Sequence, residues 1–510
     1  MYRKKRYDDC IKEVKSKLKK FPNSLHLLNY QAMAYSALKR DKEALLSYQN
    51  IIKEDPSLAG PYYNIGIILK RNGRVEEAID IYKKAISLKP DYVQAYNNLG
   101  VLYKDNKKYE NAIKMFTRAK ELQPDHQNSY YNLALIKKEQ GLDEEAIELF
   151  LKVLELNPEH NEAKYRISIT KFDNGLLEES KKYLQEILIS DETHEGAAKY
   201  LAFIALKQVR FQEVWKYYEY RWKVSPGKDL IWPFQGRPLW KGEKGKRVVL
   251  WKEQGVGDDI IFLGLVSEVK EMCSSLSVFV DPRLQLLCRR AMPEINFVKD
   301  IDELKEVDSD YHLPIGSVPG LIRNDISDFD RTVTGYLKAD PIRVASIRNE
   351  LQLDGKIAIG ISWKSFNSLN HTKKSVQLRD LERVFSGLDI VLVNLQYGDV
   401  EDEIREFKEE TGIEVVQCAS VDNKEDLDGL AALIEVCDIV VSTTNVTVHM
   451  AGALAKETWV LLPYVANFWW LTERQDSIWY PSATLYRQPT LDDWVSVYLS
   501  IRKDLQRKFT

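Results

Sequence analysis

The sequence predicts a two-part fold, a superhelix of stacked helix pairs followed by an α/β region with two doubly wound parallel sheets. The first part is predicted by proline and alanine residues that recur every 34 positions. The second is predicted by apolar strands and amphipathic helices that alternate from residue 247 and begin a second series at residue 357. The chain has 510 residues, more than one hydrophobic core usually holds, so two or three domains are expected.

The composition excludes several classes of protein. The chain carries 73 basic and 76 acidic residues, a net charge of −3, which gives no case for a nucleic acid or an anionic membrane as a partner. Its five cysteines are odd in number and lack a C-x-x-C pair, so neither a disulfide framework nor a zinc site is predicted. The sequence has no apolar run long enough for a membrane span and no secretion signal, so we expect a cytoplasmic location.

The 34-residue period defines the helical part. Each period reads as two amphipathic helices, for example 59–72 and 75–88, with a break near Gly73 and a stop at Pro90. The recurring residues are Pro22, Pro56, Pro90, Pro124 and Pro158, and Ala44, Ala78, Ala112 and Ala146. This pattern resembles the tetratricopeptide repeat over residues 1–222. The resemblance weakens at 161–222, as expected for a terminal unit that packs against another part, and the first unit has only its second helix.

The resemblance implies a concave face that binds a peptide. Asn64, Asn98 and Asn132 occupy one repeat position on it, similar to the asparagine ladder with which O-GlcNAc transferase holds the backbone of its protein acceptor. Lys70, Lys104 and Lys138 form a second ladder that could attract acidic side chains. The alternative is that consensus repeats copy solvated residues without a binding role.

The predicted domains follow from these patterns. They are the repeats (1–222), a junction rich in Trp, Pro and Gly (223–246), an N-terminal α/β half (247–340), a C-terminal α/β half (341–490) and a C-terminal helix (491–510). In the first half we expect strands at 247–251, 276–280 and 311–315, with helices at 258–272 and 282–291. In the second half we expect strands at 357–363, 390–395, 414–417, 438–443 and 458–462, with helices at 341–351, 378–386, 401–410, 427–437 and 446–456.

The stretch from Asp438 to Gly452 is the strongest candidate for a binding site. Its apolar strand ends in small polar residues and leads into a helix, whose first amides have no internal partner and point along the positive end of the helix dipole. Thr444 and Asn445 could therefore form a phosphate cradle, with His449 one turn further on. The alternative is that Thr444 or Asn445 only caps the helix.

Other motifs exclude two further classes. Gly255-Val-Gly257 lacks the third glycine of a dinucleotide-binding fingerprint, and no P-loop motif occurs. Asp308-Ser-Asp310 matches the D-x-D of metal-dependent transferases superficially, but we expect a solvated turn there. Metal ligands are not predicted at any position.

Five motifs resemble the GT-B glycosyltransferases of the lipopolysaccharide heptosyltransferase type, over residues 247–490. They are Trp251-Lys-Glu-Gln-Gly-Val-Gly-Asp258, Gly360-Ile-Ser-Trp-Lys-Ser365, Asn394-Leu-Gln-Tyr-Gly398, His449-Met-Ala-Gly-Ala-Leu454 and Trp459-Val-Leu-Leu-Pro463. The layout is similar to that of bacterial members with N-terminal tetratricopeptide repeats, some of which glycosylate flagellin. The resemblance implies a GT-B fold of two Rossmann-like domains, with the nucleotide-sugar bound by the C-terminal half and no metal or other cofactor.

The resemblance also implies roles for single residues. Asp258 matches the proposed base, which takes the proton of the acceptor hydroxyl, although it could instead cap the helix that begins there. Lys364, Lys373 and Lys374 would neutralise charge on the leaving phosphate, and Gln396 would contact the base or ribose. The family has aspartate in place of Thr444 and threonine in place of Asn445, and this departure bears on the donor. Aromatic residues between 469 and 480 (Trp469, Trp470, Trp479 and Tyr480), with Arg474, could stack on a sugar or base, or could pack in the core.

These inferences lead to one main hypothesis and two alternatives. The main hypothesis is a cytoplasmic, metal-independent GT-B glycosyltransferase that moves a sugar from a nucleotide donor to a protein acceptor, such as a flagellin-like protein, held by the repeats. One alternative is a catalytically silent scaffold. The other is an enzyme that acts on a glycan or lipid-linked acceptor while its repeats recruit a partner.

Overall fold

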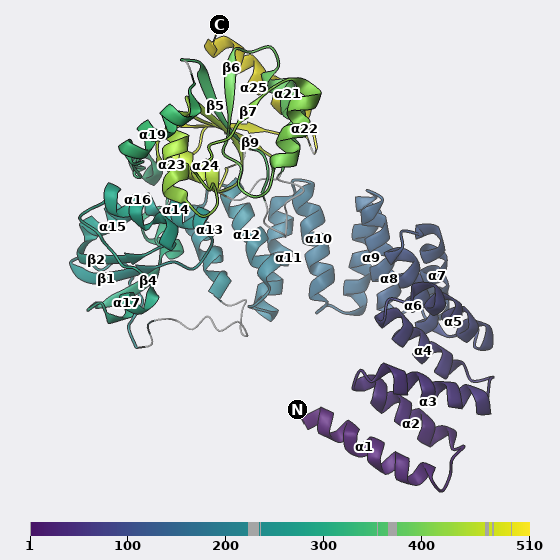
Figure 1. The fold of residues 1–510 in the computed structure, drawn as a ribbon. Coiled ribbons are helices and arrows are strands. Elements are labelled where there is room, and N and C mark those ends of the chain that lie inside the picture. The colour runs from purple at the N-terminus through teal and green to yellow at the C-terminus, as the bar shows by residue number, and fades with distance from the viewer. Residues whose placement is uncertain are drawn as a thin grey trace. The chain divides into compact units, whose positions relative to one another are not determined.

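A computed structural model describes residues 2–222, 234, 236–353, 355–365, 375–464, 469–471, 474–490 and 492–509. Contacts within the chain divide it into two units, Met1–Asp191 and Glu192–Thr510. The first unit contains helices only, and the second contains two parallel sheets (Figure 1). Most of the predicted junction, residues 223–233 and 235, lies outside the described residues.

The first unit is a row of antiparallel helix pairs. Its helices are α1 (Tyr2–Leu18), α2 (Leu25–Ala37), α3 (Asp41–Glu54), α4 (Ala59–Arg71), α5 (Val75–Leu88), α6 (Val93–Asp105), α7 (Tyr109–Leu122), α8 (Gln127–Glu139), α9 (Asp143–Leu156), α10 (Asn161–Asp173) and α11 (Leu177–Ser190). The alanine at the repeat position is fully buried in all four units that carry it. The predicted helix pairs are therefore confirmed.

Glycine at a second repeat position lets the two helices of a pair approach closely. A β-carbon on Gly66 would lie 2.6 Å from the Tyr82 ring, and one on Gly100 would lie 2.6 Å from the Phe116 ring, 34 residues further on. Both rings are fully buried. The large side chain of the second helix thus occupies the space that the first helix leaves empty, which explains why the two residue types recur together.

The second unit begins with one more helix pair, α12 (Glu195–Lys207) and α13 (Phe211–Tyr218), and a short 3-10 helix, η1 (Glu219–Trp222). A four-stranded parallel sheet follows, in the order β3-β2-β1-β4. Its strands are β1 (Lys246–Trp251), β2 (Cys273–Phe279), β3 (Asn296–Phe297) and β4 (Tyr311–Pro314). The helices of this half are α14 (Val256–Leu263), α15 (Val266–Met272), α16 (Gln285–Ala291), α17 (Ile301–Glu306) and α18 (Pro319–Ile322).

The helix expected at 258–272 is interrupted, because α14 ends at Leu263 and α15 begins at Val266. A β-carbon on Gly264 would lie 2.9 Å from the Tyr336 ring, and the Tyr336 hydroxyl donates a hydrogen bond of 2.7 Å to the Ile260 carbonyl. A side chain distant in the sequence therefore packs against the break, and helical periodicity alone could not reveal it.

The second sheet has six parallel strands in the order β10-β9-β8-β5-β6-β7. Its strands are β5 (Ile357–Ser362), β6 (Ile390–Asn394), β7 (Val415–Val416), β8 (Ile439–Thr443), β9 (Thr458–Leu462) and β10 (Ala483–Arg487). Its helices are α19 (Pro341–Leu351), α21 (Glu382–Phe385), α22 (Glu401–Thr411), α23 (Leu427–Val436), α24 (Val446–Ala453) and α25 (Trp494–Phe509). Strand β10 was not predicted. The C-terminal helix, expected at 491–510, begins at Trp494 and extends to Phe509.

Alternate residues of these strands enter two different cores. Val440 belongs to the core under α19, α23 and α24, whereas Ile439 and Val441 belong to the core under α21, α22 and α25. Both faces of the sheet are therefore covered by helices (Figure 1), which explains the continuous apolar runs in the sequence. The predicted parallel α/β region is confirmed.

The strand order creates a switch point in each sheet. In the second sheet the chain starts at β5, moves outward through β6 and β7, and then crosses to β8 on the other side. In the first sheet it starts at β1 and later crosses to β4. Ligands of open parallel sheets bind at the carboxyl ends of the strands at such points. By this rule a ligand is expected at the loops after β5 and β8 and at the loop after β1.

Candidate functional site

Asn445 stands at the switch point of the second sheet, as the N-cap of α24. Its Oδ1 accepts hydrogen bonds from the Thr447 amide (3.0 Å) and the Ser442 hydroxyl (3.2 Å). Its Nδ2 donates to Ser362 Oγ (2.7 Å) and to the Lys364 carbonyl (3.1 Å) at the end of β5. The side chain thus caps the helix, as one of the two interpretations expected, and both ends of its amide are used within the protein. Any contact of Asn445 with an anion would be made by the backbone.

Gln396, just after β6, forms hydrogen bonds with the end of β5 and the residues that follow it. Its Oε1 accepts hydrogen bonds from Ser362 Oγ (3.1 Å) and from the Trp363 and Lys364 amides (2.9 and 2.7 Å), and its Nε2 donates to the Tyr397 carbonyl (3.0 Å). The residue is 2% exposed. Ser362, Gln396 and Asn445 therefore form one network across β5, β6 and β8. The amide expected to contact a base or ribose is already bonded within the protein.

Thr444 differs from its neighbour because its hydroxyl is not used. The residue is 7% exposed, and Oγ1 is buried without a hydrogen-bond partner in the part of the chain that the structure describes. Thr443, the last residue of β8, has a second hydroxyl of this kind. Buried polar atoms without a partner are rare in folded proteins and call for an explanation. At the start of α24, a bound anion would supply one.

Lys364 reaches the site with its backbone, while its side chain is ion-paired with Glu403 of α22. Both side chains are partly exposed, 30% and 22%. A phosphate at the end of β5 would therefore compete with Glu403 for the ammonium group. Lys373 and Lys374, the other two expected cations, lie outside the described residues.

His449 lies where the two α/β halves meet. Its Nδ1 is 3.1 Å from the Tyr480 hydroxyl, and its ring stacks on Trp470 with centroids 5.8 Å apart. A β-carbon on Gly257, in the first turn of α14, would lie 3.1 Å from His449 Cδ2. Helices α14 and α24 thus pack against each other, which brings the loop after β1 to the loop after β8.

Asp258 is half-buried in that first turn of α14. The N-cap of α14 is Gly255, so the alternative in which Asp258 caps the helix is wrong. The carboxylate lies near two buried phenols. Burial raises the pKa of both Tyr218 and Tyr480 well above the ordinary value, and the negative charge of Asp258 raises each pKa further. The preceding residue, Gly257, packs against His449 of α24, so the first turn of α14, with Asp258, lies where the two halves meet.

Asp259, the next residue, points into the core instead. It is fully buried, and its Oδ2 accepts a hydrogen bond of 2.9 Å from the Asp281 amide. Its Oδ1 has no partner among the described residues, and Lys252 Nζ lies 3.8 Å from the carboxylate. Burial raises the pKa of Asp259 to about 7.

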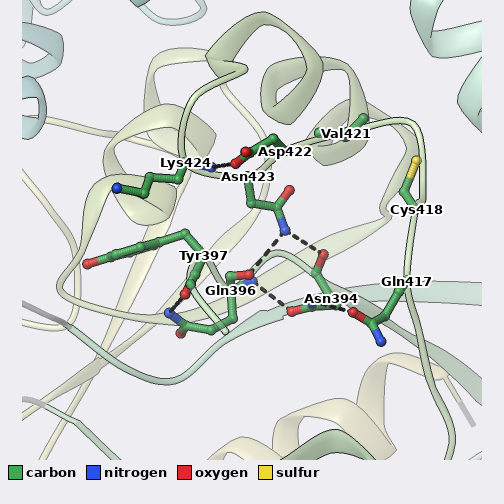
Figure 2. A pocket seen from close by; sticks show the side chains of 10 residues that line it. Asn394, Gln396, Tyr397, Gln417, Cys418, Val421, Asp422, Asn423 and Lys424 are labelled. Carbon is green, nitrogen blue, oxygen red and sulfur yellow. Dashed lines mark hydrogen bonds between the residues drawn. The ribbon is translucent and has the colours of Figure 1, made fainter. Parts of the chain in front are cut away.

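A polar pocket opens at the carboxyl ends of β6 and β7 (Figure 2). Its volume is about 310 Å³. Its lining residues are Asn394, Gln396, Tyr397, Gly398, Gln417, Cys418, Val421, Asp422, Asn423 and Lys424. Asn423 donates to the Asn394 carbonyl (3.1 Å) and the Gln396 carbonyl (3.2 Å), so it joins the 418–424 loop to β6. Amides that donate and accept, beside a tyrosine ring, suit a planar heterocycle.

Sequence reasoning missed most of this pocket. Asn394 and Tyr397 stand in a motif quoted above, on either side of Gln396, but were given no role. Gln417 and Asn423 lie in the loop after β7, which carries no periodic signal. Only the pairing of β6 with β7 brings these residues together.

The aromatic residues between 469 and 480 are packed inside the protein. Trp469, Trp470, Trp479 and Tyr480 are each at most 7% exposed, and Arg474 pairs with Asp476 at 2.8 Å. The Trp469 ring lies against Phe262 of α14 (centroids 5.3 Å apart) and Tyr218 of α13 (5.8 Å). These contacts support the core-packing interpretation of the segment.

The asparagine ladder of the repeats is partly bonded within the superhelix. Asn98 Nδ2 donates to the Tyr63 hydroxyl (3.2 Å), and Asn132 Nδ2 donates to Asn97 Oδ1 (3.2 Å) and the Asn128 carbonyl (2.9 Å). Asn64, the first member, is half-buried. Asn98 and Asn132 therefore already donate hydrogen bonds within the superhelix, which leaves fewer amide hydrogens for a bound peptide.

The lysine ladder is also partly neutralised. Lys104 pairs with Asp105 at 3.2 Å, and Lys138 lies 3.1 Å from Asp143 and 3.6 Å from Asp173. Lys70 is half-buried at the end of α4. An acidic partner would meet less positive charge on this face than the sequence suggests.

Three further expectations concern metals, thiols and membranes. Within the described ranges, no group of three or more His, Cys, Asp or Glu side chains could hold a metal ion. Asp308 and Asp310 both pair with Arg247 at the start of β1.

All five cysteines are free thiols. Among the helices of the described residues, none is both long and apolar enough to span a membrane.

Together, the helix pairs and the two sheets define a repeat protein with a C-terminal parallel α/β region. A sequence model described as "TPR repeat" matches residues 68–107, and one described as "Tetratricopeptide repeat" matches residues 91–159. The chain therefore carries tetratricopeptide repeats, as predicted.

Protein FlbA of Caulobacter vibrioides is 30% identical to this chain over 311 residues, which cover 56% of this chain and 50% of FlbA. The chain thus spans about half the length of the curated relative that it matches. Solved structures with similar regions include MamA (27% identity, 30% of this chain and 89% of MamA, TM-score 0.28). They also include PilF of Pseudomonas aeruginosa (16%, 44% and 95%, TM-score 0.36). YrrB, described as a TPR protein with an unusual peptide-binding site, is a third (21%, 36% and 95%, TM-score 0.31).

Proposed function

We propose that this protein is a metal-independent glycosyltransferase of the GT-B type, which moves a sugar from a nucleotide-sugar to a protein acceptor held by the repeats. The observation that carries the proposal is the contact between α14 and α24. It packs the first turn of α14, which carries Asp258, against His449 of α24, and the unused hydroxyl of Thr444 lies just before that helix begins. A carboxylate that takes a proton and a helix N-terminus that binds a phosphate, at adjacent switch points, would together serve sugar transfer from a nucleotide.

The donor would be bound by the second sheet. The amides at the start of α24 and the Thr444 hydroxyl would bind the phosphates, because an orphan donor near a helix N-terminus is stabilised by a negative charge. The 310 Å³ pocket at β6 and β7 would take the nucleoside. The network of Ser362, Gln396 and Asn445 connects the two places through hydrogen bonds. A diphosphate or monophosphate would then leave from a site fixed by the backbone.

The acceptor hydroxyl would be activated from the first sheet. Asp258 would take its proton while the hydroxyl oxygen forms a bond to the anomeric carbon of the sugar. The bond from that carbon to the phosphate oxygen breaks, and its electron pair leaves with the nucleotide. The products are therefore a glycosylated protein and a free nucleotide.

A second candidate function is a catalytically silent adaptor, and a specific observation favours it. The side chain of Lys364 pairs with Glu403, and the amide of Gln396 is bonded within the protein. Two groups expected to hold a nucleotide are thus already occupied, as they would be in a domain that no longer binds one. A transferase for a glycan, with repeats that recruit a partner enzyme, would share the donor site and differ only in its acceptor.

Substitution of Thr444 by valine separates the enzyme from the adaptor. The change preserves shape and removes only the hydroxyl. If that hydroxyl binds phosphate, the affinity for the favoured nucleotide, chosen by a thermal-shift panel of UDP, GDP, ADP and CMP, should fall by roughly 10- to 100-fold in calorimetry. Thr443→Val is the matched control, because it removes the neighbouring orphan hydroxyl from the strand.

The adaptor hypothesis predicts the opposite result. Without a ligand, replacing a buried, unbonded hydroxyl by a methyl group should leave stability unchanged or raise it, and no nucleotide should stabilise the wild-type protein. If a nucleotide does bind, Asp258→Asn should abolish sugar transfer and leave nucleotide affinity unchanged. Transfer by Asp258→Asn at the wild-type rate would refute the assignment of Asp258 as the base.

A further inference from the structure

The last helix pair of the helical part is bonded to the loop that leads to Asp258. Arg221 of η1 forms a two-pronged ion pair with Glu253, with Nε to Oε2 at 2.8 Å and Nη2 to Oε1 at 2.7 Å. Its guanidinium lies over the rings of Tyr218 (4.2 Å) and Trp222 (4.7 Å). The side chains of Arg221 and Glu253 are only 16% and 3% exposed. A buried guanidinium from the helical part thus pairs with a carboxylate in the loop after β1.

Tyr218, the last residue of α13, makes a second connection. Its hydroxyl accepts a hydrogen bond of 2.7 Å from Gln254 Nε2. Its ring packs edge-on against Trp215 of the same helix and against Trp469. Because burial and the nearby charges of Glu253 and Asp258 raise its pKa well above the ordinary value, the phenol is neutral at every physiological pH.

Three consecutive residues before α14 are therefore fixed by side chains from other elements. Lys252 bonds to Asp281 (3.0 Å), Glu253 to Arg221 and Gln254 to Tyr218. The next residue, Gly255, is the N-cap of α14, and Asp258 follows within the first turn. The direction in which the first turn of α14 leaves the sheet is thus set partly by α13 and η1.

Apolar packing alone would be enough for a terminal repeat pair to cover the end of a superhelix. A buried ion pair is a poor device for that purpose, since removing two charges from water costs about as much free energy as their attraction returns. It does impose one geometry, because a guanidinium and a carboxylate meet in a single plane. The arrangement at Arg221 and Glu253 therefore indicates a requirement for position more than for stability.

We propose that Arg221 and Tyr218 are positioning residues for Asp258, so that η1 and the end of α13 contribute to the transferase site. This inference rests on the proposed function, in which Asp258 is the base. Arg221 and Tyr218 act by holding Glu253 and Gln254, and through them the loop that presents the carboxylate.

The test uses the full chain with Arg221→Gln and Tyr218→Phe. The matched controls are Arg210→Gln at the N-cap of α13, which removes the exposed Arg210–Glu213 pair, and Tyr217→Phe on α13, which removes the neighbouring hydroxyl. Hydrogen exchange of the peptide that covers residues 252–258 is measured by mass spectrometry. Nucleotide affinity and the kcat and KM of sugar transfer are measured on the same samples.

We expect amide exchange at 252–258 to become faster by on the order of tenfold in both test variants and to stay at the wild-type rate in both controls. The kcat should fall by about 10- to 100-fold, because a displacement of about 1 Å has that effect on a positioned catalytic group. The KM for the nucleotide-sugar should stay within about twofold of the wild-type value, since Arg221 and Tyr218 hold the loop after β1, whereas the proposed phosphate site is at the start of α24. A change confined to kcat distinguishes positioning from general loss of structure.

Wild-type exchange rates and an unchanged kcat in Tyr218→Phe would overturn the proposal. If Arg221→Gln fails to fold, Tyr218→Phe decides alone, since it deletes a single oxygen and keeps every ring contact. If the wild-type protein transfers no sugar, the proposed function fails, and the exchange measurement still shows whether the helix pair orders the loop. The two failures are therefore distinguishable.

Discussion

Replacement of the buried Asp259 by asparagine should change how stability depends on pH. In the native state the carboxyl has a pKa of about 7, because burial outweighs the attraction of Lys252. In the unfolded chain its pKa is near the ordinary value of 3.8. Asparagine has nearly the same shape and cannot ionise, so the substitution isolates the cost of the charge.

The sign and size of the effect follow from proton linkage. Between pH 4 and pH 7 the unfolded chain has lost the proton of Asp259 and the folded chain still holds it. The free energy of unfolding therefore falls as the pH rises, by about 1.4 kcal/mol for each pH unit. From pH 5 to pH 8 the loss accumulates over about two units, until the folded pKa is passed, and amounts to about 3 kcal/mol. Asp259→Asn should not show this loss.

Tryptophan fluorescence is suited to the measurement because all eleven tryptophans lie after residue 192, in the unit that contains Asp259. Urea unfolding of both proteins at pH 5 and pH 8 gives four free energies. The free energy of unfolding of the variant, relative to that of the wild type, should increase by about 3 kcal/mol from pH 5 to pH 8, since all other groups titrate alike in both proteins. A difference that stays constant from pH 5 to pH 8 would refute the reasoning, because it would mean that Asp259 is ionised in the folded state at both.

Two further substitutions test other parts of the structure. Glu403→Gln frees the ammonium group of Lys364 for a bound phosphate, so calorimetry should show a nucleotide affinity about tenfold higher, and an unchanged affinity would mean that Lys364 does not contact the ligand. Gly100→Ala places a methyl group 2.6 Å from the Phe116 ring and should destabilise the repeats by about 1–3 kcal/mol, as followed by circular dichroism. Gly60→Ala, whose methyl group would meet nothing within 4 Å, is the control and should not destabilise.

The sequence predicted the helical part well because its determinants are local. Ala78 and Pro90 belong to a pattern that repeats every 34 residues, and each unit packs mainly on its neighbours. The strands that feed the candidate site were also predicted, because an apolar run such as 439–441 followed by small residues has few other structures open to it. Strand β10 (Ala483–Arg487) was missed, since it follows an aromatic segment whose packing partners lie elsewhere in the chain.

The site was predicted only as far as single loops allow. The start of α24 was identified from its own sequence, and the structure places Thr444, Asn445 and His449 there. The partners of Asn445 and His449 could not be predicted, because Ser362, Lys364 and Tyr480 come from segments distant in the sequence that only the folded sheet brings to α24. The same holds for Asn423, which enters the pocket wall from a loop without a periodic pattern.

The boundary between the two units has a consequence for how such a protein can change during evolution. Because the pair α12–α13 belongs to the same unit as the sheets, whereas α1–α11 form the other, whole helix pairs could be gained, lost or exchanged before Glu192 without disturbing the hydrogen bonds of Arg221 and Tyr218. The repeats and the α/β region could then diverge independently. For protein engineering, Glu192 is a better point than residue 223 at which to graft a foreign repeat array.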